Sequence, residues 1–479
     1  MGLSRSSSTS GSNAAEKLER SKKEREEGVS LEVGRIDEEG QQAEQVDGVF
    51  GQTGGDKVNY RAVGWFSTSV LLMKSQIGLG VLSIPDVFHT LGLGPGIIII
   101  VVMAILTTWT DYYIGGPWKA LHPSCYSVSD CGMILGGRVG RELFGVAYWL
   151  LMTCIAGSAL LGLSTALNAI SLHGTCTAVF VAVAAIACFP VASLRTLGSV
   201  KWIGWAGLIS MVVSILLVAI AVGAGGRPSP APQEGPWDKD LVMWGNPSFT
   251  DAMNAVSNIM FSYAGTAAFL PIASEMRNPR DFPKAVALCQ TFVTAFYIVV
   301  GVVVYIYAGQ YVASPALGTA GTLIKRVAYG LALPGLLAAA LPAKWIFVRA
   351  MRNSRHLTES TKTHWTVWLS CTLGCVLFSY IIASAIPVFG GLVGLVGALF
   401  GSFLSLTGVS WMWFYDSRKT WAGKHGAAYW GLWAFNAFIV VAGLFLTVAG
   451  TYGSVISIRD SYAASGGRPF TCADNSGSS

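Results

Sequence analysis

Two short stretches of the chain combine glycine, proline and small polar residues inside segments that are otherwise apolar. The first runs from Ser75 to Pro85 and the second from Phe261 to Pro271. Glycine and proline interrupt helices, and an interrupted helix leaves backbone N–H and C=O groups without partners. Free N–H groups at the start of a half-helix suit a carboxylate, and free carbonyl groups suit an ammonium group. The two stretches therefore have the chemistry to bind a zwitterionic small molecule.

The residues of the two interruptions are the candidate substrate-binding residues. They are Gln76, Ile77, Gly78, Leu79 and Gly80 in the first, and Phe261, Ser262, Tyr263, Gly265 and Thr266 in the second. Gly157 and Ser158 of the third apolar segment are expected to shape the side-chain pocket together with Phe261 and Tyr263. Neither interruption contains an acidic residue, which favours a neutral ligand, with aromatic ones among the candidates. Close helix packing is the alternative role for the glycines.

Three charged residues beside the interruptions are candidates for coupling or gating. Lys74 lies about 12 residues, or ~18 Å, into the first segment, and a lysine at that depth of a membrane is costly and usually functional. Snorkelling of its side chain to the surface is the alternative. Glu275 is a candidate gate or proton-handling group, although an ion pair with Arg277 or Arg280 explains it equally well. Asp86 is a candidate residue of an outer gate.

The elements that position these residues are membrane-spanning helices. Of 479 residues, 52% are hydrophobic and 12% are charged, against about 25% charged in a soluble domain. The charge is uneven, because 21 of the 58 charged residues lie in 1–61. This composition excludes an ordinary soluble enzyme, a coiled coil and a collagen. It predicts an all-α polytopic membrane protein, with a disordered cytoplasmic tail at 1–61.

Eleven segments are long enough to cross a hydrocarbon core of ~30 Å. We predict them at 62–88, 91–114, 142–170, 175–192, 197–224, 252–275, 285–309, 319–349, 364–387, 389–415 and 428–452. With the N-terminus in the cytoplasm, 25 of the 32 Lys and Arg residues fall inside and 6 fall outside, the last being Lys74. This asymmetry favours that orientation. An odd number of spans places the C-terminal tail, 453–479, outside the cell.

The segments divide into two blocks of nearly equal length. The first five cover 62–224 and the next five cover 252–415, and the segment at 428–452 is additional. Five is an odd number, so the second block crosses the membrane in the opposite sense. Inverted repeats with helices interrupted at matching positions are typical of secondary transporters, which bind their substrate near the bilayer midplane.

Other classes of function fit less well. The six histidines have no metal-ligand spacing, no nucleophile–base pair lies within a segment, and 92–96 lacks the lysine of a phosphate loop. We therefore expect no enzyme activity, no metal and no cofactor. The net charge of +6 is distributed between apolar segments, so no nucleic acid is expected as a partner. A channel would line its pore with repeated polar rings, and intramembrane charge is sparse here.

Several motifs resemble those of the amino acid/auxin permease family. The stretch 77–85 (IGLGVLSIP) is similar to the first-helix motif of that family, and 261–266 (FSYAGT) followed by 274–279 (SEMRNP) to its sixth-helix motif. The stretches 385–389 (AIPVF) and 394–400 (GLVGALF) are similar to its ninth and tenth helices. The resemblance covers about 60–479 and is nearest to the fungal neutral amino-acid permeases.

The resemblance implies the inverted-repeat fold of the leucine transporter and uptake of amino acids driven by an ion gradient. The eighth segment departs from the family, since it is short and lacks a His before Lys344. From Leu323 to Asn353 it also contains no Ser or Thr, whose hydroxyl groups commonly bind sodium in relatives of this fold. We therefore expect import of neutral amino acids with protons at the plasma membrane. Sodium coupling, exchange, a channel and an amino-acid sensor are the alternatives.

The cysteines suggest one disulfide bond. Of nine cysteines, only Cys176 and Cys472 are predicted on the oxidising outer side. Cys125 and Cys131 fall in a cytoplasmic loop, and the other five lie within segments. We expect Cys176 and Cys472 to pair and to hold the C-terminal tail over the outer surface. Free thiols or pairing between chains are the alternatives.

Overall fold

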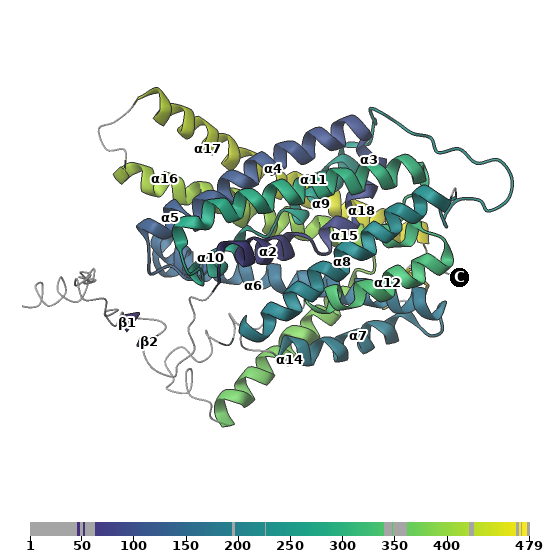
Figure 1. Cartoon of the computed structure of the whole chain (residues 1–479), viewed down its shortest axis with the longest axis horizontal. Helices are drawn as coiled ribbons and strands as arrows, with labels where there is room; N and C mark the ends of the chain where they lie inside the picture. The colour runs from purple at the N-terminus through teal and green to yellow at the C-terminus, as the bar shows by residue number, and fades with distance from the viewer. Residues whose placement is uncertain are drawn as a thin grey trace, which may run out of the picture. The chain divides into compact units, whose positions relative to one another are not determined.

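The structure is a computed structural model of the whole chain (Figure 1). It describes residues 46–47, 51–52, 63–193, 197–225, 227–339, 347, 362–420, 426–465, 469–470 and 472–476. The chain forms two units, Met1–Tyr60 and Arg61–Ser479. In the first unit, strands β1 (Val46–Asp47) and β2 (Gly51–Gln52) pair antiparallel. Apart from these strands, the tail predicted as disordered at 1–61 lies outside the described residues.

The second unit is built from helices. Their bounds are α2 (Trp65–Gln76), η1 (Gly80–Leu82), α3 (Ile84–Leu91), α4 (Leu93–Gly115), α5 (Pro117–Leu121), α6 (Val128–Ser171), α7 (Thr177–Ala192), α8 (Leu197–Gly225), α9 (Phe249–Ser262), α10 (Thr266–Ser274), η2 (Pro279–Asp281), α11 (Phe282–Ala308), η3 (Gly309–Tyr311), η4 (Ala316–Thr319), α12 (Thr322–Leu337), α14 (Lys362–Ala385), α15 (Phe389–Val396), η6 (Gly397–Thr407), α16 (Gly408–Thr420), α17 (Ala427–Phe445), η7 (Leu446–Gly450) and α18 (Thr451–Ser465). The stretches η6 and η7 are π-helical.

Each predicted segment contains helix, but the number of crossings stays a prediction. By length and composition, eight helical stretches among the described residues can cross a bilayer. Helices α7 and α12 have 16 residues each and are shorter. Lys344 and residues 340–346, which follow α12, lie outside the described residues, and the short inner half of the eighth segment therefore stays a prediction.

The last helical stretch continues to Ser465, beyond the predicted end at 452. Its extension contains Ser454, Ser457 and Ser461, which lower the hydropathy without breaking the helix. Ser454 Oγ donates to Asn254 Oδ1 at 3.0 Å, and Ser461 Oγ donates to the carbonyl of Ser457 at 2.8 Å. A serine hydroxyl satisfied by its own helix or by a neighbouring helix is compatible with helix, so the hydropathy minimum did not mark the end.

Contacts between the helices of the second unit define two packed sets. In one set, α11 packs against α2, α3 and α4, and α10 packs against α2 and α4. In the other set, α6 packs against α7, α12 and α14, and α8 packs against α12. Helix α9 packs against α3 and α4 of the first set and against α15, η6 and α18, which belong to neither set. Helix α8 of the second set packs against α2 and α11 of the first.

Helix α9 lies against a surface made of glycines. A methyl group at Gly397 would overlap the carbonyl oxygen of Ser257, and one at Gly450 would overlap the hydroxyl of the same serine. A methyl group at Gly394 would overlap Asn254 Oδ1, and one at Gly453 would lie 2.6 Å from the carbonyl oxygen of Thr250. The absence of side chains at these four glycines lets α15, η6, η7 and α18 approach the backbone of α9.

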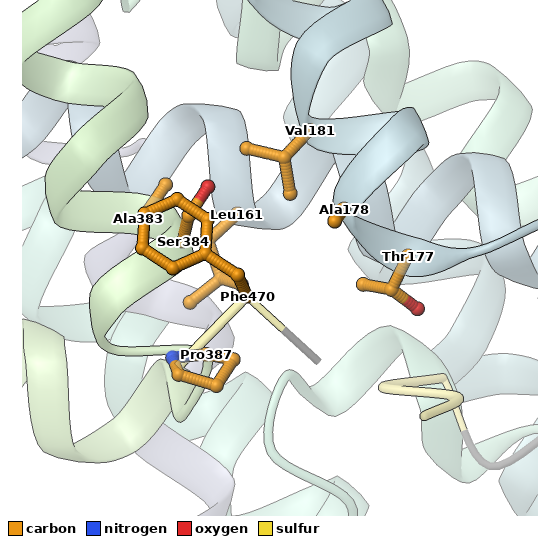
Figure 2. A pocket seen from close by; sticks show the side chains of 8 residues that line it. All are labelled: Leu161, Thr177, Ala178, Val181, Ala383, Ser384, Pro387 and Phe470. Carbon is orange, nitrogen blue, oxygen red and sulfur yellow. The ribbon is translucent and has the colours of Figure 1, made fainter. Parts of the chain in front are cut away.

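The C-terminal tail is fastened to the second set of helices. Its Cys472 forms a disulfide bond with Cys176, which precedes α7. Asn475 accepts a hydrogen bond from Asn168 Nδ2 of α6 at 2.7 Å. The ring of Phe470 lines a small pocket together with residues of α6, α7 and α14 (Figure 2). The residues that line this pocket are Leu161, Thr177, Ala178, Val181, Ala383, Ser384, Pro387 and Phe470 itself.

We expect peptide mapping of the intact protein without reductant to yield a linked peptide containing Cys176 and Cys472. A bond across 296 residues closes a long loop, which in the chain-entropy model stabilises the fold by about 5–6 kcal/mol. Reduction should therefore lower the melting temperature, and a Cys472→Ser variant should show the lower value before reduction. Alkylation of either cysteine in the unreduced protein would contradict the bond.

Candidate functional site

The first interruption separates α2 from α3. Helix α2 ends at Gln76, and Ile77 leaves the helical conformation at φ −75° and ψ 88°. The chain resumes as one 3₁₀ turn at Gly80–Leu82 before α3 begins at Ile84. Pro85 lies in the first turn of α3, where the missing N–H group costs no hydrogen bond. The glycine and proline thus mark the end of one half-helix and the start of the next.

The second interruption separates α9 from α10 and is shorter than predicted. Helix α9 ends at Ser262 and α10 begins at Thr266, so only 263–265 is non-helical. Phe261 and Ser262 belong to the last turn of α9. The backbone of Gly265 bends the chain close to the first interruption, because a methyl group there would lie 2.9 Å from Gln76 Cγ and from Ser75 Oγ.

The structure brings the two interruptions into direct contact. A methyl group at Gly80 would lie 2.5 Å from both Cα and Oγ of Ser262. The phenol of Tyr297, from α11, lies 2.9 Å from the carbonyl oxygen of Gln76 and 3.0 Å from that of Ser262. The single phenol hydrogen is thus shared between the last carbonyl groups of both half-helices. Tyr297 is fully buried, so no solvent replaces it in this role.

Several backbone donors at the interruptions have no backbone partner. Among the described residues, the N–H groups of Gly78, Leu79 and Gly265 make no backbone hydrogen bond. A methyl group at Gly78 would meet no atom within 4 Å, so unfilled space adjoins Gly78. Such N–H groups beside half-helix ends form a suitable site for a carboxylate.

Lys74 lies one turn before the first interruption and turns toward the other set of helices. A methyl group at Gly207 of α8 would lie 3.0 Å from Lys74 Cε and 3.0 Å from Ala338 Cβ. The lysine therefore lies where α2 and α8 approach the end of α12. No hydrogen bond or ion pair joins its ammonium group to the residues that the structure describes.

The two candidate gate residues lie at opposite ends of the interrupted helices. Asp86 Oδ2 would be 3.7 Å from a methyl group at Gly390, at the start of α15, and Ser314 Oγ would be 3.2 Å from it. Asp86 thus lies where α3 meets α15. Glu275 directly follows α10, and its carbonyl oxygen accepts a hydrogen bond from the N–H of Val63 at 3.4 Å. This bond ties the chain before α2 to the end of α10.

Two residues predicted to shape the side-chain pocket, Gly157 and Tyr263, pack against other helices. A methyl group at Gly157 would lie 3.2 Å from Ile382 Cγ2, so this glycine packs against α14 and not against the interruptions. Gly162 does face them, since a methyl group there would lie 3.5 Å from Leu79 Cδ2, and Ser158 lies one turn away on the same face. The ring of Tyr263 packs edge-on against Tyr297, 5.4 Å between centroids, and points toward α11.

The sequence reasoning missed residues that come from neighbouring helices. Tyr297 gave no signal, because a tyrosine in an apolar segment is common. Asp111 did give one, as an isolated carboxyl group inside the second segment, and the structure buries it completely. The small pocket lined by Phe470 includes no residue of the interruptions.

Comparisons with known proteins agree with this arrangement. Residues 61–456 match the family model described as transmembrane amino acid transporter protein. A transmembrane transporter of Gibberella moniliformis is 34% identical over 428 residues, which cover 88% of this chain and 90% of the relative. The N amino acid transport system protein of Neurospora crassa is 32% identical over 431 residues, covering 86% and 89%. These relatives are transporters and not enzymes.

Among solved structures, the nucleobase-cation-symport-1 family transporter Mhp1, closed with bromovinylhydantoin bound, has a similar fold. The TM-score is 0.50 at 13% identity, and the match covers 88% of this chain and 96% of that one. This likeness shows the expected fold class, the all-helical fold of the leucine-transporter type. The inverted repeat, with its boundaries at 62–224 and 252–415, stays a prediction.

Replacing Tyr297 by Phe should lower the free energy of unfolding by about 1–3 kcal/mol, since it leaves two buried carbonyl groups without their donor. The measurement is the melting temperature of the purified protein in detergent. Tyr307→Phe, on the exposed side of the same helix, is the matched control and should melt like the parent protein. If the parent protein and both variants have the same melting temperature, the bridging hydroxyl contributes nothing to the stability of the fold.

Proposed function

Because the chain belongs to the transmembrane amino acid transporter family, we propose that it imports neutral amino acids together with protons by alternating access. The observation that carries this proposal is the contact between the two interruptions, which brings together N–H groups that have no backbone partner, with unfilled space at Gly78. The N-terminus is proposed to lie in the cytoplasm and the C-terminal tail outside, at the plasma membrane. The lysine and arginine distribution and the Cys176–Cys472 bond support this orientation.

The substrate's carboxylate would accept hydrogen bonds from the free N–H groups of Gly78, Leu79 and Gly265. Its ammonium group would bind the carbonyl groups left by the interruptions. Both groups are present in every amino acid, so this part of the site recognises the class. Selection among side chains would fall to apolar neighbours such as Leu79 and Leu336, both buried beside Gly162. Apolar walls favour neutral substrates, because a charged side chain would lose its hydration there.

Replacing Gly80 by Ala should reduce uptake of radiolabelled neutral amino acids by about tenfold or more, since overpacking by one methyl group costs about 1–3 kcal/mol. The added methyl would separate the first interruption from Ser262. Uptake is measured in cells with surface expression quantified alongside. Gly374→Ala, at an exposed glycine with no neighbour within 4 Å, is the control and should transport normally. Normal uptake by the Gly80 variant would refute the site.

Proton coupling is proposed because the usual ligands for sodium are missing. The chain has no Ser or Thr from Leu323 to Asn353, so α12 offers no Ser or Thr hydroxyl group beyond its first residue, Thr322. In their place, the side chain of Lys74 approaches Gly207 and Ala338, at the junction of α2, α8 and α12. The fixed positive charge of an ammonium group can replace a bound sodium ion in such a position, which makes the ion unnecessary.

We expect uptake at constant pH to be the same in sodium and choline buffers, and to be lost when a protonophore collapses the pH gradient. The control is the same protein with both gradients absent, which should equilibrate the amino acid without accumulating it. A strict requirement for sodium, with indifference to the protonophore, would overturn proton coupling while leaving the substrate site intact.

A further inference from the structure

A buried polar cluster lies directly behind the two interruptions. It consists of Asp111 from α4, Gln290 from α11 and Thr266, the first residue of α10. Gln290 Nε2 donates a hydrogen bond to Asp111 Oδ2. The three side chains are at most 4% exposed. An acidic side chain that faces the interior of a membrane bundle is rare and usually functional.

The hydrogen bonding of this cluster is incomplete. Asp111 Oδ1, Gln290 Oε1 and Thr266 Oγ1 are all buried and have no hydrogen-bond partner. A buried oxygen without a partner costs free energy, so an arrangement that supplies a donor is favoured. When the carboxyl group is ionised, Asp111 Oδ1 and Gln290 Oε1 can only accept hydrogen bonds, and the Thr266 hydroxyl is the one possible donor among the three. A proton added to Asp111 Oδ1 turns this oxygen into a donor toward its neighbours.

The cluster also reaches both interruptions. Cys289, which precedes Gln290, lies with Sγ 4.0 Å from Gln76 Oε1 at the end of α2. Gln76 Nε2 is buried without a partner, and Gln76 Cγ would lie 2.9 Å from a methyl group at Gly265. Thr266 begins the half-helix that follows the second interruption. A change of charge at Asp111 therefore alters the electrostatic potential at the C-terminal end of α2 and at the N-terminal end of α10.

No described cation neutralises Asp111. Among the residues that the structure describes, no ion pair involves it. Of the elements packed on α4, helix α10 and η6 contain no titratable side chain. Helix α11 carries Cys289, Tyr297, Tyr305, Tyr307 and Lys284, and Lys284 pairs with Asp281. The other elements packed on α4 bring Asp86 and His89 of α3, Lys119 of α5, Asp251 of α9, and Tyr415, Asp416 and Arg418 of α16. Of these, Asp416 binds His122 and also Tyr113 of α4.

We propose that Asp111 carries the proton that crosses the membrane with the amino acid, an inference that rests on the proposed function. The proton passes from water on the outer side to Asp111 Oδ1, giving a neutral acid that donates to Thr266 Oγ1 or Gln290 Oε1. After the transporter opens inward, the O–H bond breaks and the proton returns to water. The carboxylate then remains until the next cycle. In this scheme, Lys74 occupies the position of a coupling cation, and Asp111 carries the proton that is transported.

The test uses the full-length protein in liposomes loaded with a pH-sensitive dye, under an imposed pH gradient. Asp111→Asn keeps the size of the side chain but cannot exchange a proton. We expect this variant to lose both concentrative uptake and substrate-induced acidification of the lumen. Substrate-induced thermal stabilisation should persist, because the free N–H groups are untouched. Asp240→Asn, in an exposed loop, is the control and should retain both activities.

The outcomes separate this inference from the proposed function. If the parent protein accumulates substrate without regard to the pH gradient, proton coupling itself is wrong. If the parent is proton-driven and Asp111→Asn still accumulates substrate and acidifies the lumen, the proton is carried elsewhere. If the parent protein is driven by sodium and the Asp111→Asn variant no longer responds to sodium, the cluster is a cation site and the inference is overturned. Should Asp111→Asn fail to fold, Thr266→Val should shift the pH of half-maximal uptake, and an unchanged pH midpoint would overturn the inference.

Discussion

The structure depends on one constraint, which is that backbone polar groups inside a bilayer must find partners within the protein. Two helices are interrupted here at the same place in the fold, and each interruption frees such groups. The chain meets the constraint by placing the interruptions against each other and by bringing the hydroxyl of Tyr297 to the last carbonyl groups of both. Some N–H groups remain free, and a ligand that satisfies them completes the hydrogen bonding that the helices began.

Helix α11 organises this region more than its sequence suggests. Within about two turns it brings Cys289, Gln290 and Thr294 toward the interrupted helices, with Tyr297 one turn further on. It packs against both halves of the first interrupted helix and against α4. The substrate site and the Asp111 cluster therefore share a single supporting helix, which gives a physical route by which occupancy of one alters the other.

The sequence predicted what depends on local composition and missed what depends on how helices face each other. Apolar length placed the helices, and glycine with proline placed both interruptions within a residue or two. What the sequence did not predict is the direction in which a residue faces around its helix. Gly157 and Gly162 both lie in α6, but only Gly162 faces Leu79, because each residue turns the helix by about 100°. The role of Tyr297 rests on two carbonyl groups from distant segments, which no local pattern contains.

The glycine surface beneath α9 has a mechanical consequence. Two helices with interlocking side chains are held in register, since each side chain must leave its rotamer before the helices shift. Gly394, Gly397, Gly450 and Gly453 present backbone alone to α9. The position of α9 along this surface is therefore set by the hydrogen bonds that join Asn254 to Ser454 and Ser457 of α18. A movement of the half-helix that carries part of the binding site would have to break these two hydrogen bonds, but it would not have to unlock packed side chains.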